Sequence, residues 1–462
     1  MMNACLYLSS TAKIQGAPPS VTQAIKERLT FPNPEFEAAR KLNKYCYHLP
    51  RTISFYQEEP DGLSFPKGFA GAAWNLCRSI SALEPELVDD RHELVPINIT
   101  FTGSLRPYQE KAVNAMLSRT MGVLKSGTGS GKTVIAIALI CKIRQPTLVL
   151  VPNKELMYQF ADRLKAFTDI KEVGLIGDGR FEIQPVTVGI YNSVVRRLEE
   201  LEYCFGMLVY DECHKSGSGI HGGQILSAFP ARYMYGVTAT NWRNDGLDGL
   251  IYVYLGDLVH TVDDRELRDN GAVLTPEIVF RTTRFTFPYA DNYQDLVSAM
   301  TADDDRNHQI SADVAAETAA TRAPILVISN RTDHCDTLRQ MIAAKGIACE
   351  MVTGKSSSAK RRQAIDRVRA GEVQVLVATT SLLSEGFDLP ALSRLFITVS
   401  IRFSGLLIQT CGRLLRPSPD GDQPIIYDYV DIEVGVLKAA AKARRTTYQQ
   451  MGWINPLLNN TN

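Results

Sequence analysis

The sequence predicts an α/β chain of two tandem domains, each a parallel sheet flanked by helices, preceded by a small α+β domain. Short runs rich in Val, Ile and Leu, typical of strands buried on both faces, alternate with helical stretches from residue 105 onward. After a stretch of mixed character at about 256–307 the alternation starts again. Strands separated by helices form parallel sheets, because each crossover returns the chain in the same direction.

The domain boundaries follow from these changes of pattern. At 462 residues the chain is long enough for about two to four domains. We expect a small accessory domain at residues 1–95, a first α/β domain at 96–265, a connector at 266–310, a second α/β domain at 311–432, and a C-terminal helix with its tail at 433–462.

Composition and charge are those of an ordinary globular protein. Apolar residues make up 45% of the chain, charged residues 22%, and the formal net charge is zero, so any nucleic-acid contact must rest on local patches. The nine cysteines form no C-x-x-C pair, which argues against a zinc site or a disulfide framework. No apolar run reaches the roughly 18 residues of a membrane span, and the first residues lack a signal-peptide pattern. We expect a soluble cytoplasmic or nucleoid-associated protein.

The first 95 residues are divided into short segments by proline pairs and a Glu-Pro-Asp-Gly turn. We expect helices at 21–29 and 35–42, a strand at 52–56 and a charged linker at 84–93. Acidic and basic residues nearly balance here, so no electrostatic signature of nucleic-acid binding is predicted. An aromatic group could stack on bases, although such side chains more often form the core of a small domain: Tyr45, Tyr47, Phe55 and Tyr56.

Each expected strand of the two α/β domains is a short run rich in Val, Ile, Leu or Tyr. In the first domain these runs are at 121–124, 147–151, 186–191, 207–210 and 233–237, with a helix at 155–167. In the second they are at 325–329, 349–352, 373–378, 395–399 and 425–429, with helices at 333–344 and 360–369. A basic helix at 434–451 follows, and its Lys and Arg side chains are expected on a solvated face.

A glycine-rich loop separates the first of these strands from a helix. Its sequence is Ser126-Gly127-Thr128-Gly129-Ser130-Gly131-Lys132-Thr133. Glycines let backbone N–H groups converge on phosphate oxygens, and the helix N-terminus adds partial positive charge. Lys132 is expected to reach the β- and γ-phosphates of ATP, and the Thr133 hydroxyl to ligate Mg²⁺. The pattern usually has glycine where Ser126 stands, but a small side chain still fits.

Adjacent carboxylates end the apolar run at 207–210. In a P-loop ATPase such a pair holds Mg²⁺ and polarises the attacking water, roles that we assign to Asp211 and Glu212. A solvated turn is the alternative interpretation of the same two residues. The next strand ends in two hydroxyl residues, Thr238 and Thr240, which could hydrogen-bond the carboxylate and relay the state of the nucleotide.

Two arginines of the second α/β domain, Arg413 and Arg416, are three residues apart and therefore share a helix face, with Gln409 preceding them. Guanidinium groups that face a γ-phosphate stabilise its charge in the transition state, whereas structural salt bridges are the alternative role.

Two further segments are candidates for nucleotide contact. The Gln109 amide, about twenty residues before the loop, matches the donor and acceptor edge of adenine. The turn with Gly386 and Asp388 follows a strand of the second domain, where it could touch both strand backbone and nucleotide.

Together these motifs resemble those of the DExH-type superfamily 2 helicases, and they occur in the family's order. They are a Q-motif-like segment at 105–109, motif I at 126–133, motif Ia at 151–156, motif II at 211–214, motif III at 238–240, motif V at 380–388 and motif VI at 409–416. Residues 236–246 and 304–307 are similar to the XPB-, RadD- and UvsW-like DNA helicases, which in turn resemble the motor subunit of type III restriction enzymes. The resemblance covers residues 105 to about 430.

The resemblance implies two RecA-like domains that use ATP and Mg²⁺. The catalytic residues it implies are Lys132, Asp211, Glu212, Arg413 and Arg416, with Mg²⁺ on Thr133 and Asp211. The ATP-binding residues it implies are Arg106, Gln109, Gly127, Thr128, Gly129, Ser130, Gly131, Lys132, Thr133, Gly386 and Asp388. Coupling between ATP and nucleic acid falls to His214, Thr238, Thr240 and Gln409.

The implied activity is that of an ATP-dependent helicase or translocase that binds nucleic-acid backbone, with DNA favoured over RNA, and that unwinds strands or remodels branched DNA. Protein partners would belong to a repair, recombination or defence complex, and the accessory domain is placed like the small recognition domain of some relatives. Three alternatives stay open: a duplex-DNA translocase motor of a restriction or defence complex, an RNA helicase, and a scaffold with a decayed ATP site.

Overall fold

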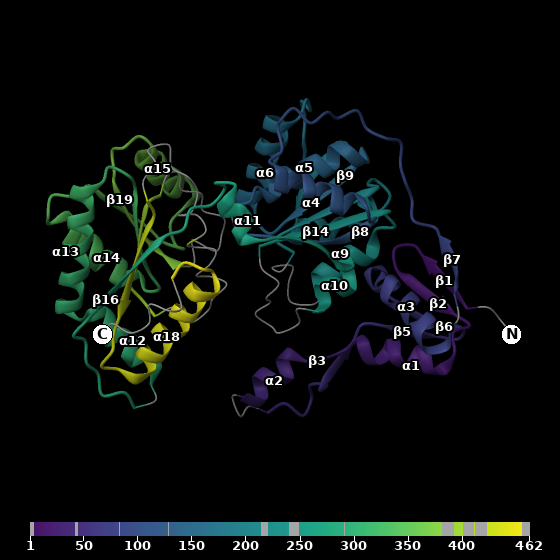
Figure 1. Cartoon of the computed structure of the whole chain (residues 1–462), viewed down its shortest axis with the longest axis horizontal. Helices are drawn as coiled ribbons and strands as arrows, with labels where there is room; N and C mark the ends of the chain where they lie inside the picture. The colour runs from purple at the N-terminus through teal and green to yellow at the C-terminus, as the bar shows by residue number, and fades with distance from the viewer. Residues whose placement is uncertain are drawn as a thin grey trace. The chain divides into compact units, whose positions relative to one another are not determined.

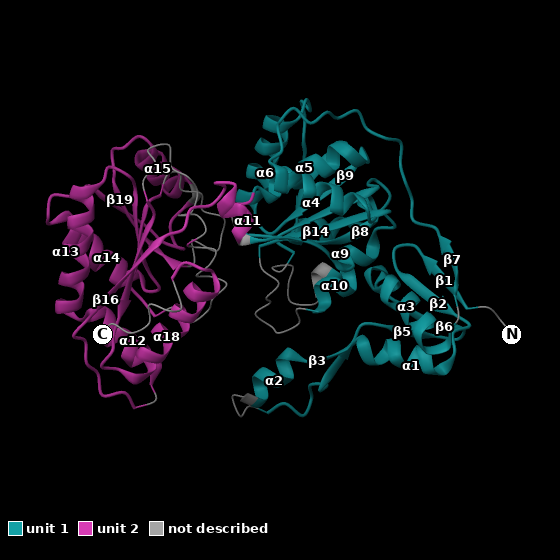
Figure 2. Ribbon diagram, in the orientation of Figure 1, with its two compact units in different colours: residues 1–127, 131–263 teal, residues 128–130, 264–462 magenta. Residues whose placement is uncertain are grey.

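The computed structural model describes residues 4–41, 45–82, 84–127, 129–213, 220–239, 249–290, 292–380, 392–400, 411 and 423–454. The chain falls into two compact units, one of residues 1–127 and 131–263 and the other of residues 128–130 and 264–462 (Figure 2). Both units combine parallel sheets with helices, so the predicted α/β class is confirmed. None of the described helices has the length and apolar character needed to cross a membrane.

The accessory domain of the first unit is built on a five-stranded sheet of order β5-β6-β2-β1-β7 (Figure 1). Its strands are β1 (Cys5–Leu8), β2 (Ala12–Gln15), β5 (Gln57–Glu59), β6 (Gly62–Phe65) and β7 (Glu86–Asp89). Two helices, α1 (Pro19–Arg28) and α3 (Ala70–Ser81), share its core, and a 3₁₀ turn, η1 (Lys67–Phe69), leads into α3. Alternate residues of β1, β2 and β6 are buried, as one covered sheet face requires.

The charged linker expected at 84–93 is a wrong prediction. Strand β7 lies within that stretch and pairs in parallel with β1, with Glu86 opposite Cys5. Because β7 is an edge strand and mostly exposed, it lacks the apolar pattern by which a strand is recognised in sequence.

Between α1 and β5 the chain forms a two-stranded antiparallel ribbon, and a helix lies between its two strands in sequence. The ribbon is β3 (Thr30–Pro32) with β4 (Thr52–Ser54), and the helix is α2 (Pro34–Lys41). The helices expected at 21–29 and 35–42 and the strand expected at 52–56 are thus confirmed to within two residues.

The rest of the first unit is organised by an eight-stranded sheet of order β11-β10-β12-β9-β13-β14-β8-β15, parallel throughout except for β11. Its strands are β8 (Met121–Ser126), β9 (Thr147–Val151), β10 (Gly174–Gly177), β11 (Arg180–Glu182), β12 (Val186–Ile190), β13 (Met207–Asp211), β14 (Tyr233–Thr238) and β15 (Leu258–Val262). Every residue of β9 and β13 is buried, which explains why both are unbroken apolar runs rather than alternating ones.

Helices connect these strands and cover the sheet. They are α4 (Pro107–Leu117), α5 (Lys132–Ile143), α6 (Lys154–Phe167), α7 (Tyr191–Val194), α8 (Leu198–Leu201), α9 (Ile220–Ala228) and α10 (Gly249–Leu255). A 3₁₀ turn, η2 (Val195–Arg197), joins α7 to α8. Seven of the twelve residues of α5 are buried, so this helix lies deep in the fold and fixes the loop that precedes it.

The accessory domain packs directly on α10. Leu250 and Val253 of α10 belong to its hydrophobic core, and a Cβ added to Gly68 would stand 2.4 Å from the backbone of Tyr254. Lys67 is buried, and its Nζ donates to the carbonyls of Phe229 at 2.5 Å and Ala231 at 3.2 Å. Burial, with nearby Arg91 adding to it, lowers the pKa of Lys67 to about 7. The two domains therefore share one continuous packed interior.

The second unit contains a six-stranded parallel sheet of order β16-β21-β20-β17-β19-β18. Its strands are β16 (Glu277–Thr282), β17 (Ile325–Ser329), β18 (Cys349–Val352), β19 (Val375–Thr379), β20 (Arg394–Ile397) and β21 (Ile425–Val430). Its helices are α11 (Asp264–Asp269), α12 (Tyr293–Ala302), α13 (Asp304–Ala320), α14 (Thr332–Ala343), α15 (Ser358–Arg369) and α18 (Gly435–Gln450). The strands expected in the second domain are confirmed to within two residues at either end.

Helix α18 corresponds to the predicted basic helix, but one of its cations does not lie on a solvated face. Arg444 is 3% exposed and pairs with the buried carboxylate of Asp428 at 2.6 Å, while the Tyr448 hydroxyl donates to the same carboxylate at 2.9 Å. The helix is thereby fixed to β21 by a buried ion pair that sequence periodicity did not reveal.

Candidate nucleotide-binding site

The predicted phosphate loop, the carboxylate pair and the first hydroxyl of motif III meet at one edge of the eight-stranded sheet. Strand β14 lies between β13 and β8, with Val237 opposite Asp211 and Thr238 opposite Lys125. All three strands are parallel, so their carboxyl ends, where polar side chains follow the apolar runs, share this edge. In open α/β sheets ligands bind beyond such carboxyl ends.

The loop has the backbone that a phosphate cradle requires. Gly129 and Gly131 have φ values of +88° and +78°, a region that side chains with a Cβ rarely adopt. Gly131 is the N-cap of α5, so the first backbone N–H groups of this helix face the loop. The Lys132 ammonium lies on the loop, 3.3 Å from the carbonyl of Ser126 and 3.5 Å from that of Gly127. Ser126 is fully buried as the last residue of β8, which shows why a small side chain is accepted there.

Gln109 lies against the loop. Its Oε1 accepts from the backbone N–H of Arg106 at 2.9 Å, which closes the first turn of α4, and the residue is 6% exposed. A Cβ built on Gly131 would stand 2.5 Å from Gln109 Nε2. The amide and the loop are therefore in direct contact.

Replacing Gly131 by Ala should weaken ATP binding by about tenfold, because the new methyl combines backbone strain with displacement of the Gln109 amide, together costing on the order of 1–3 kcal/mol. Titration with a fluorescent ATP analogue measures the effect. Gly179→Ala is the matched control, since φ there is +79° but no atom lies within 4 Å. Equal affinity in wild type and Gly131→Ala would contradict the contact.

The carboxylate pair occupies a constrained position. Asp211 is 7% exposed, and its Oδ1 accepts from the backbone N–H of Glu212 at 3.0 Å. Glu212 has φ +49°, a left-handed conformation that costs roughly 1 kcal/mol or more in a residue with a side chain. The Cys213 N–H donates to the Val237 carbonyl at 3.2 Å, which holds the turn against β14.

A tyrosine pair supports the same turn and was not predicted from the sequence. The hydroxyl of Tyr191 donates to the main-chain carbonyl of Asp211, and its ring stacks on that of Tyr210 with centroids 4.7 Å apart. Burial raises the pKa of Tyr191 well above the ordinary value, with Tyr210 and Asp211 adding to the effect, so the phenol stays a neutral donor. A Tyr directly after the carboxyl end of β12, which is separated from β13 by β9, is the signal that could have indicated this role.

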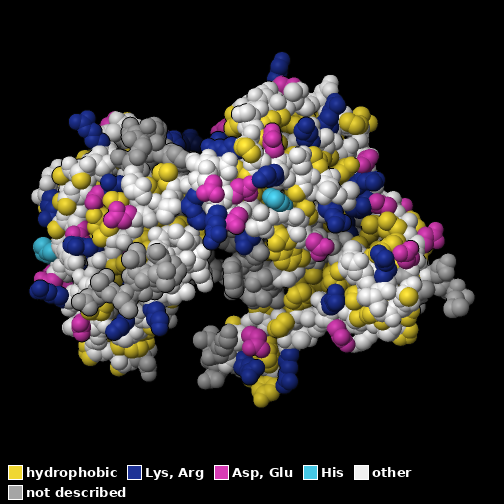
Figure 3. Space-filling model, viewed as in Figure 1, with side chains coloured by type: hydrophobic (Ala, Val, Ile, Leu, Met, Phe, Trp, Pro, Cys, Tyr) yellow, Lys and Arg dark blue, Asp and Glu magenta, His cyan; other side chains and the backbone are white. Residues whose placement is uncertain are grey.

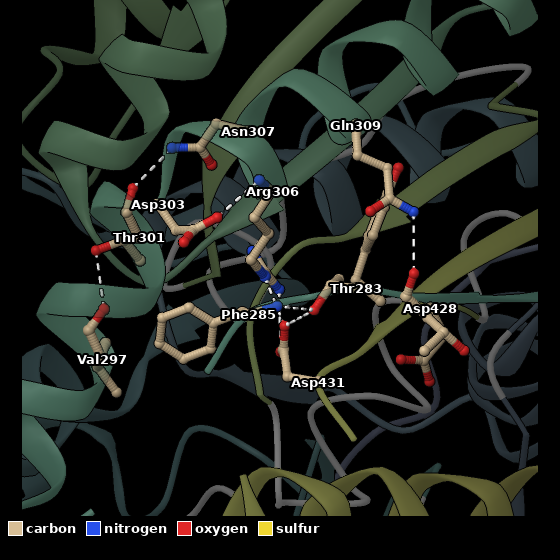
Figure 4. Close-up of polar contacts among 12 residues, drawn as sticks. Thr283, Phe285, Val297, Thr301, Asp303, Arg306, Asn307, Gln309, Asp428 and Asp431 are labelled. Atoms are coloured by element: carbon tan, nitrogen blue, oxygen red, sulfur yellow. Dashed lines mark hydrogen bonds and ion pairs between the residues drawn. The ribbon is translucent and has the colours of Figure 1, made fainter. Parts of the chain in front are cut away.

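In the second unit, the segment 304–307 that resembles the DNA-helicase branch begins α13, and its last two residues, Arg306 and Asn307, are buried (Figure 4). The Asp303 carboxylate accepts from the backbone N–H of Arg306 at 2.8 Å, and the Arg306 guanidinium pairs with Asp431 at 2.8 Å. Asp431 also accepts from the Thr283 hydroxyl at 2.6 Å. Arg306 is 2% exposed, so its positive charge depends on Asp431 for compensation.

Asn307 extends this network to a buried histidine. Its Oδ1 lies 2.9 Å from His334 Nε2, and His334 Nδ1 lies 2.9 Å from the hydroxyl of Ser329 at the end of β17. Burial, with a contribution from Arg306, lowers the pKa of His334 to about 3. The imidazole is therefore neutral across the physiological range.

The lowered pKa of His334 makes the free energy of unfolding depend on pH. Its folded pKa of about 3 lies below the unfolded value of about 6.5, so its contribution to stability is complete above pH 6.5 and is lost as pH falls towards 3, by up to about 1.4 kcal/mol per pH unit. Melting temperatures between pH 7 and 4 should therefore fall less steeply in His334→Gln than in wild type. His308→Gln, at an exposed position of α13, is the control and should follow wild type. Parallel curves for wild type and His334→Gln would refute the assignment.

Several predicted site residues lie outside the described part of the chain. They are Thr128, His214, Thr240, Gly386, Asp388, Gln409, Arg413 and Arg416. The described residues place Gln109 against the loop, and place Asp211, Glu212 and Thr238 at the same edge of the sheet as the loop. Their role in binding ATP stays a prediction. Among the described residues no group of three or more His, Cys, Asp or Glu side chains could hold a metal ion by itself.

Comparison with known proteins agrees with the resemblance that the motifs indicate. Two family profiles match, "Type III restriction enzyme, res subunit" over residues 102–243 and "Helicase conserved C-terminal domain" over residues 310–418. A putative ATP-dependent RNA helicase of Acanthamoeba polyphaga mimivirus is 26% identical, over 79% of this chain and 72% of its own length. The DNA 3'-5' helicase XPB of Kineococcus radiotolerans is 28% identical, over 75% of this chain and 63% of its own length.

Among solved structures, a fragment of a putative HsdR subunit of a type I restriction enzyme from Vibrio vulnificus is similar, with a TM-score of 0.56 and 21% identity over 74% of this chain and 66% of that one. At this identity the likeness concerns the fold alone, which is that of tandem RecA-like domains. Profiles, relatives and motif order agree. The chain is a superfamily 2 helicase of the branch that contains the XPB-type helicases and the motor subunits of type III restriction enzymes.

Proposed function

We propose that the chain is an ATP-dependent DNA helicase or translocase whose hydrolytic centre lies at the carboxyl edge of the eight-stranded sheet. The observation that carries the proposal is the juxtaposition, on neighbouring strands, of the glycine loop, the Asp211–Glu212 pair and Thr238. A scaffold with a decayed site would have no reason to keep Lys132, Asp211 and Glu212 together in this way.

The residues present suit a magnesium nucleotide. Gly129 and Gly131 leave room for phosphate oxygens close to the backbone, and Lys132 holds its charge on the loop itself. Thr133 and Asp211 would hold Mg²⁺, which neutralises charge on the phosphates when bound. Mg²⁺ in such sites takes most of its ligands from phosphate and water, so one or two protein oxygens are enough.

In this proposal each side chain has one task. Lys132 binds the β- and γ-phosphates, Glu212 orients and polarises the attacking water, and Gln109 with Arg106 contacts the base. Arg413 and Arg416 supply cations to the transition state, and Gly386 and Asp388 contact the nucleotide. His214, Thr238, Thr240 and Gln409 pass the state of the nucleotide to the nucleic-acid surface.

The preference for DNA is also part of the proposal. It is supported by the relative named as a DNA 3'-5' helicase, whereas the relative from mimivirus is named as an RNA helicase. The chain spans 63% of the former and 72% of the latter, so their whole-protein activities need not be preserved. Binding through the phosphate backbone would make activity independent of sequence and sensitive to salt. Partners in a repair, recombination or defence complex remain part of the proposal, as does a place in the cytoplasm or nucleoid.

The deciding experiment measures ATP hydrolysis against single-stranded DNA, duplex DNA, branched DNA and RNA. The proposal predicts strong stimulation by at least one DNA and weaker stimulation by RNA. Stimulation by RNA alone would make the chain an RNA helicase, and none by any nucleic acid would contradict the proposal. Strand displacement, compared with displacement of a triplex strand, then separates unwinding from translocation along duplex DNA by a restriction-type motor.

A further inference from the structure

The ribbon and helix formed by residues 30–41 and 45–54, hereafter the arm, project from the five-stranded sheet of the accessory domain (Figure 1). The base of the arm is fixed by aromatic packing. The rings of Phe31 and Phe55 meet edge to face with centroids 5.6 Å apart, and Phe55 meets the ring of Tyr254 in α10 at 6.3 Å. The Phe55 N–H donates to the carbonyl of Leu29 at 2.8 Å. The arm therefore begins from a defined position on the first α/β domain.

A buried asparagine closes the arm between its two strands. The backbone N–H of Asn33 donates to the carbonyl of Arg51 at 2.9 Å, and its side-chain amide donates to that of Pro50 at 2.8 Å. Its Oδ1 accepts from the N–H of Glu35 in the first turn of α2. Asn33 is 4% exposed, so these bonds are shielded from water and hold the two ends of the intervening segment together.

Three rings lie exposed on a turn within this segment. Tyr45 is 75% exposed and Tyr47 is 89% exposed, and the two rings lie 5.6 Å apart. The Tyr45 ring also stacks on His48 at 5.7 Å with an interplanar angle of 17°. A hydrogen bond from the Leu49 N–H to the Cys46 carbonyl closes the turn. These tyrosines are not core residues, whereas Phe55 and Tyr56 pack against the domain core as expected for a small domain.

Charge is segregated along the same stretch. Residues 1–95 contain ten Lys and Arg and eleven Asp and Glu, which is the near balance seen in the sequence. Residues 38–57, however, contain Arg40, Lys41, Lys44 and Arg51 and no acidic residue. Removing that stretch leaves six cations against eleven carboxylates in the rest of the domain. Figure 3 shows hydrophobic, basic and acidic side chains together over α2, which carries Glu35 and Glu37 in its first turn.

We propose that the arm binds single-stranded nucleic acid, with bases stacked on Tyr45 and Tyr47 and the backbone held by the exposed cations Arg40 and Arg51. The exposed rings belong to a stretch, residues 38–57, that contains cations and no carboxylate, and this combination matches a ligand that presents flat π-faces along a polyanion. The two carboxylates of the arm, Glu35 and Glu37, lie in the first turn of α2, and Glu37 pairs with Arg40 at 3.8 Å. Since every base has a π-face, binding is independent of sequence. This inference rests on the proposed function and adds a substrate class, the unpaired strand, to it.

The test is equilibrium binding without ATP, measured by anisotropy of a fluorescent single-stranded oligonucleotide. The Tyr45→Ala/Tyr47→Ala double variant should bind about tenfold or more weakly than wild type, the loss expected for one or two base stacks. Tyr45→Phe/Tyr47→Phe keeps both rings and should retain affinity. Tyr203→Ala is the matched control, since Tyr203 is 67% exposed but lies outside the arm.

A strand without bases separates stacking from charge. Wild type should bind an abasic strand as weakly as the double alanine variant binds a normal one, whereas affinity for blunt duplex should be the same in both proteins. DNA and RNA strands are both assayed, because stacking alone does not distinguish them. If the double variant binds single strands like wild type, or loses affinity for duplex equally, the arm is not a stacking platform and a protein partner becomes the better hypothesis.

The outcomes for the arm and for the proposed function are distinguishable. The double variant keeps every residue assigned to ATP, so its ATPase activity at saturating duplex should equal that of wild type. Loss of strand binding with normal ATPase supports the inference. If wild type shows no nucleic-acid-stimulated ATPase at all, the proposed function fails while the binding comparison still decides the role of the arm.

Discussion

Lys132→Ala should lower nucleic-acid-stimulated ATP turnover by on the order of 10²–10³-fold, the effect seen when one preorganised charge-stabilising group is removed from an active site. In the structure the ammonium is held by two carbonyls of the loop, within the cradle that Gly129 and Gly131 open. The charge is thus placed before the phosphates arrive, and alanine leaves the negative charge that develops on them uncompensated. Steady-state phosphate release, measured at saturating DNA, gives the loss directly.

The control for this variant is on the same helix. Lys142→Ala removes an exposed ammonium near the opposite end of α5 and should leave turnover unchanged. Both proteins should melt at the temperature of wild type when no nucleotide is present, because neither lysine contributes to the core. Undiminished turnover in Lys132→Ala would remove the loop from the mechanism.

Glu212→Gln should separate ATP binding from hydrolysis. Glutamine has the same size, so it fits the left-handed turn and leaves the Asp211 hydrogen bond in place, but it cannot polarise water. General-base groups contribute typically 10²–10⁴-fold, and we expect a loss of about that size in single-turnover hydrolysis with nearly normal nucleotide affinity. Rapid-quench measurement with radiolabelled ATP records the chemical step, and a fluorescent analogue records affinity.

Two comparisons sharpen this result. Asp211→Asn should raise the Mg²⁺ concentration needed for activity, because it removes the proposed metal ligand, whereas Glu212→Gln should not. Glu199→Gln, at an exposed position of α8, should behave like wild type. A Glu212→Gln enzyme that hydrolyses ATP at the normal rate would assign the water-activating role to another residue.

The sequence predicted the fold best at the parallel strands that are buried on both faces. The run Ile325–Ser329 forms β17 within the bounds expected, because strands covered on both faces are continuous apolar runs. The glycine loop was equally clear, since its function requires specific residue types at fixed spacing. The structure adds that Gln109 touches Gly131, a contact which motif order implies but which spacing alone does not demonstrate.

Pairings between distant residues explain what the sequence did not reveal. Arg306 and Asp431 are 125 residues apart, and nothing in the local pattern of either indicates a buried ion pair. Strand β7 was taken for a linker because an exposed edge strand depends on hydrogen bonds to β1 rather than on burial of its own side chains. The uneven distribution of charge in the accessory domain was also missed. A count of Lys, Arg, Asp and Glu over the whole domain averages the basic stretch at 38–57 with the acidic remainder.

The packing of the accessory domain on α10 has a mechanical consequence. Lys67 donates hydrogen bonds to the carbonyls of Phe229 and Ala231 before β14, and the ring of Phe55 contacts that of Tyr254. The joint therefore consists of buried hydrogen bonds and packed rings. Such a joint is stiff. Any rotation of the first α/β domain during an ATP cycle therefore moves Tyr45 and Tyr47 with it. Because these two residues are far from the hydrolytic edge, a small rotation there displaces the nucleic-acid strand that they are proposed to hold by a larger distance.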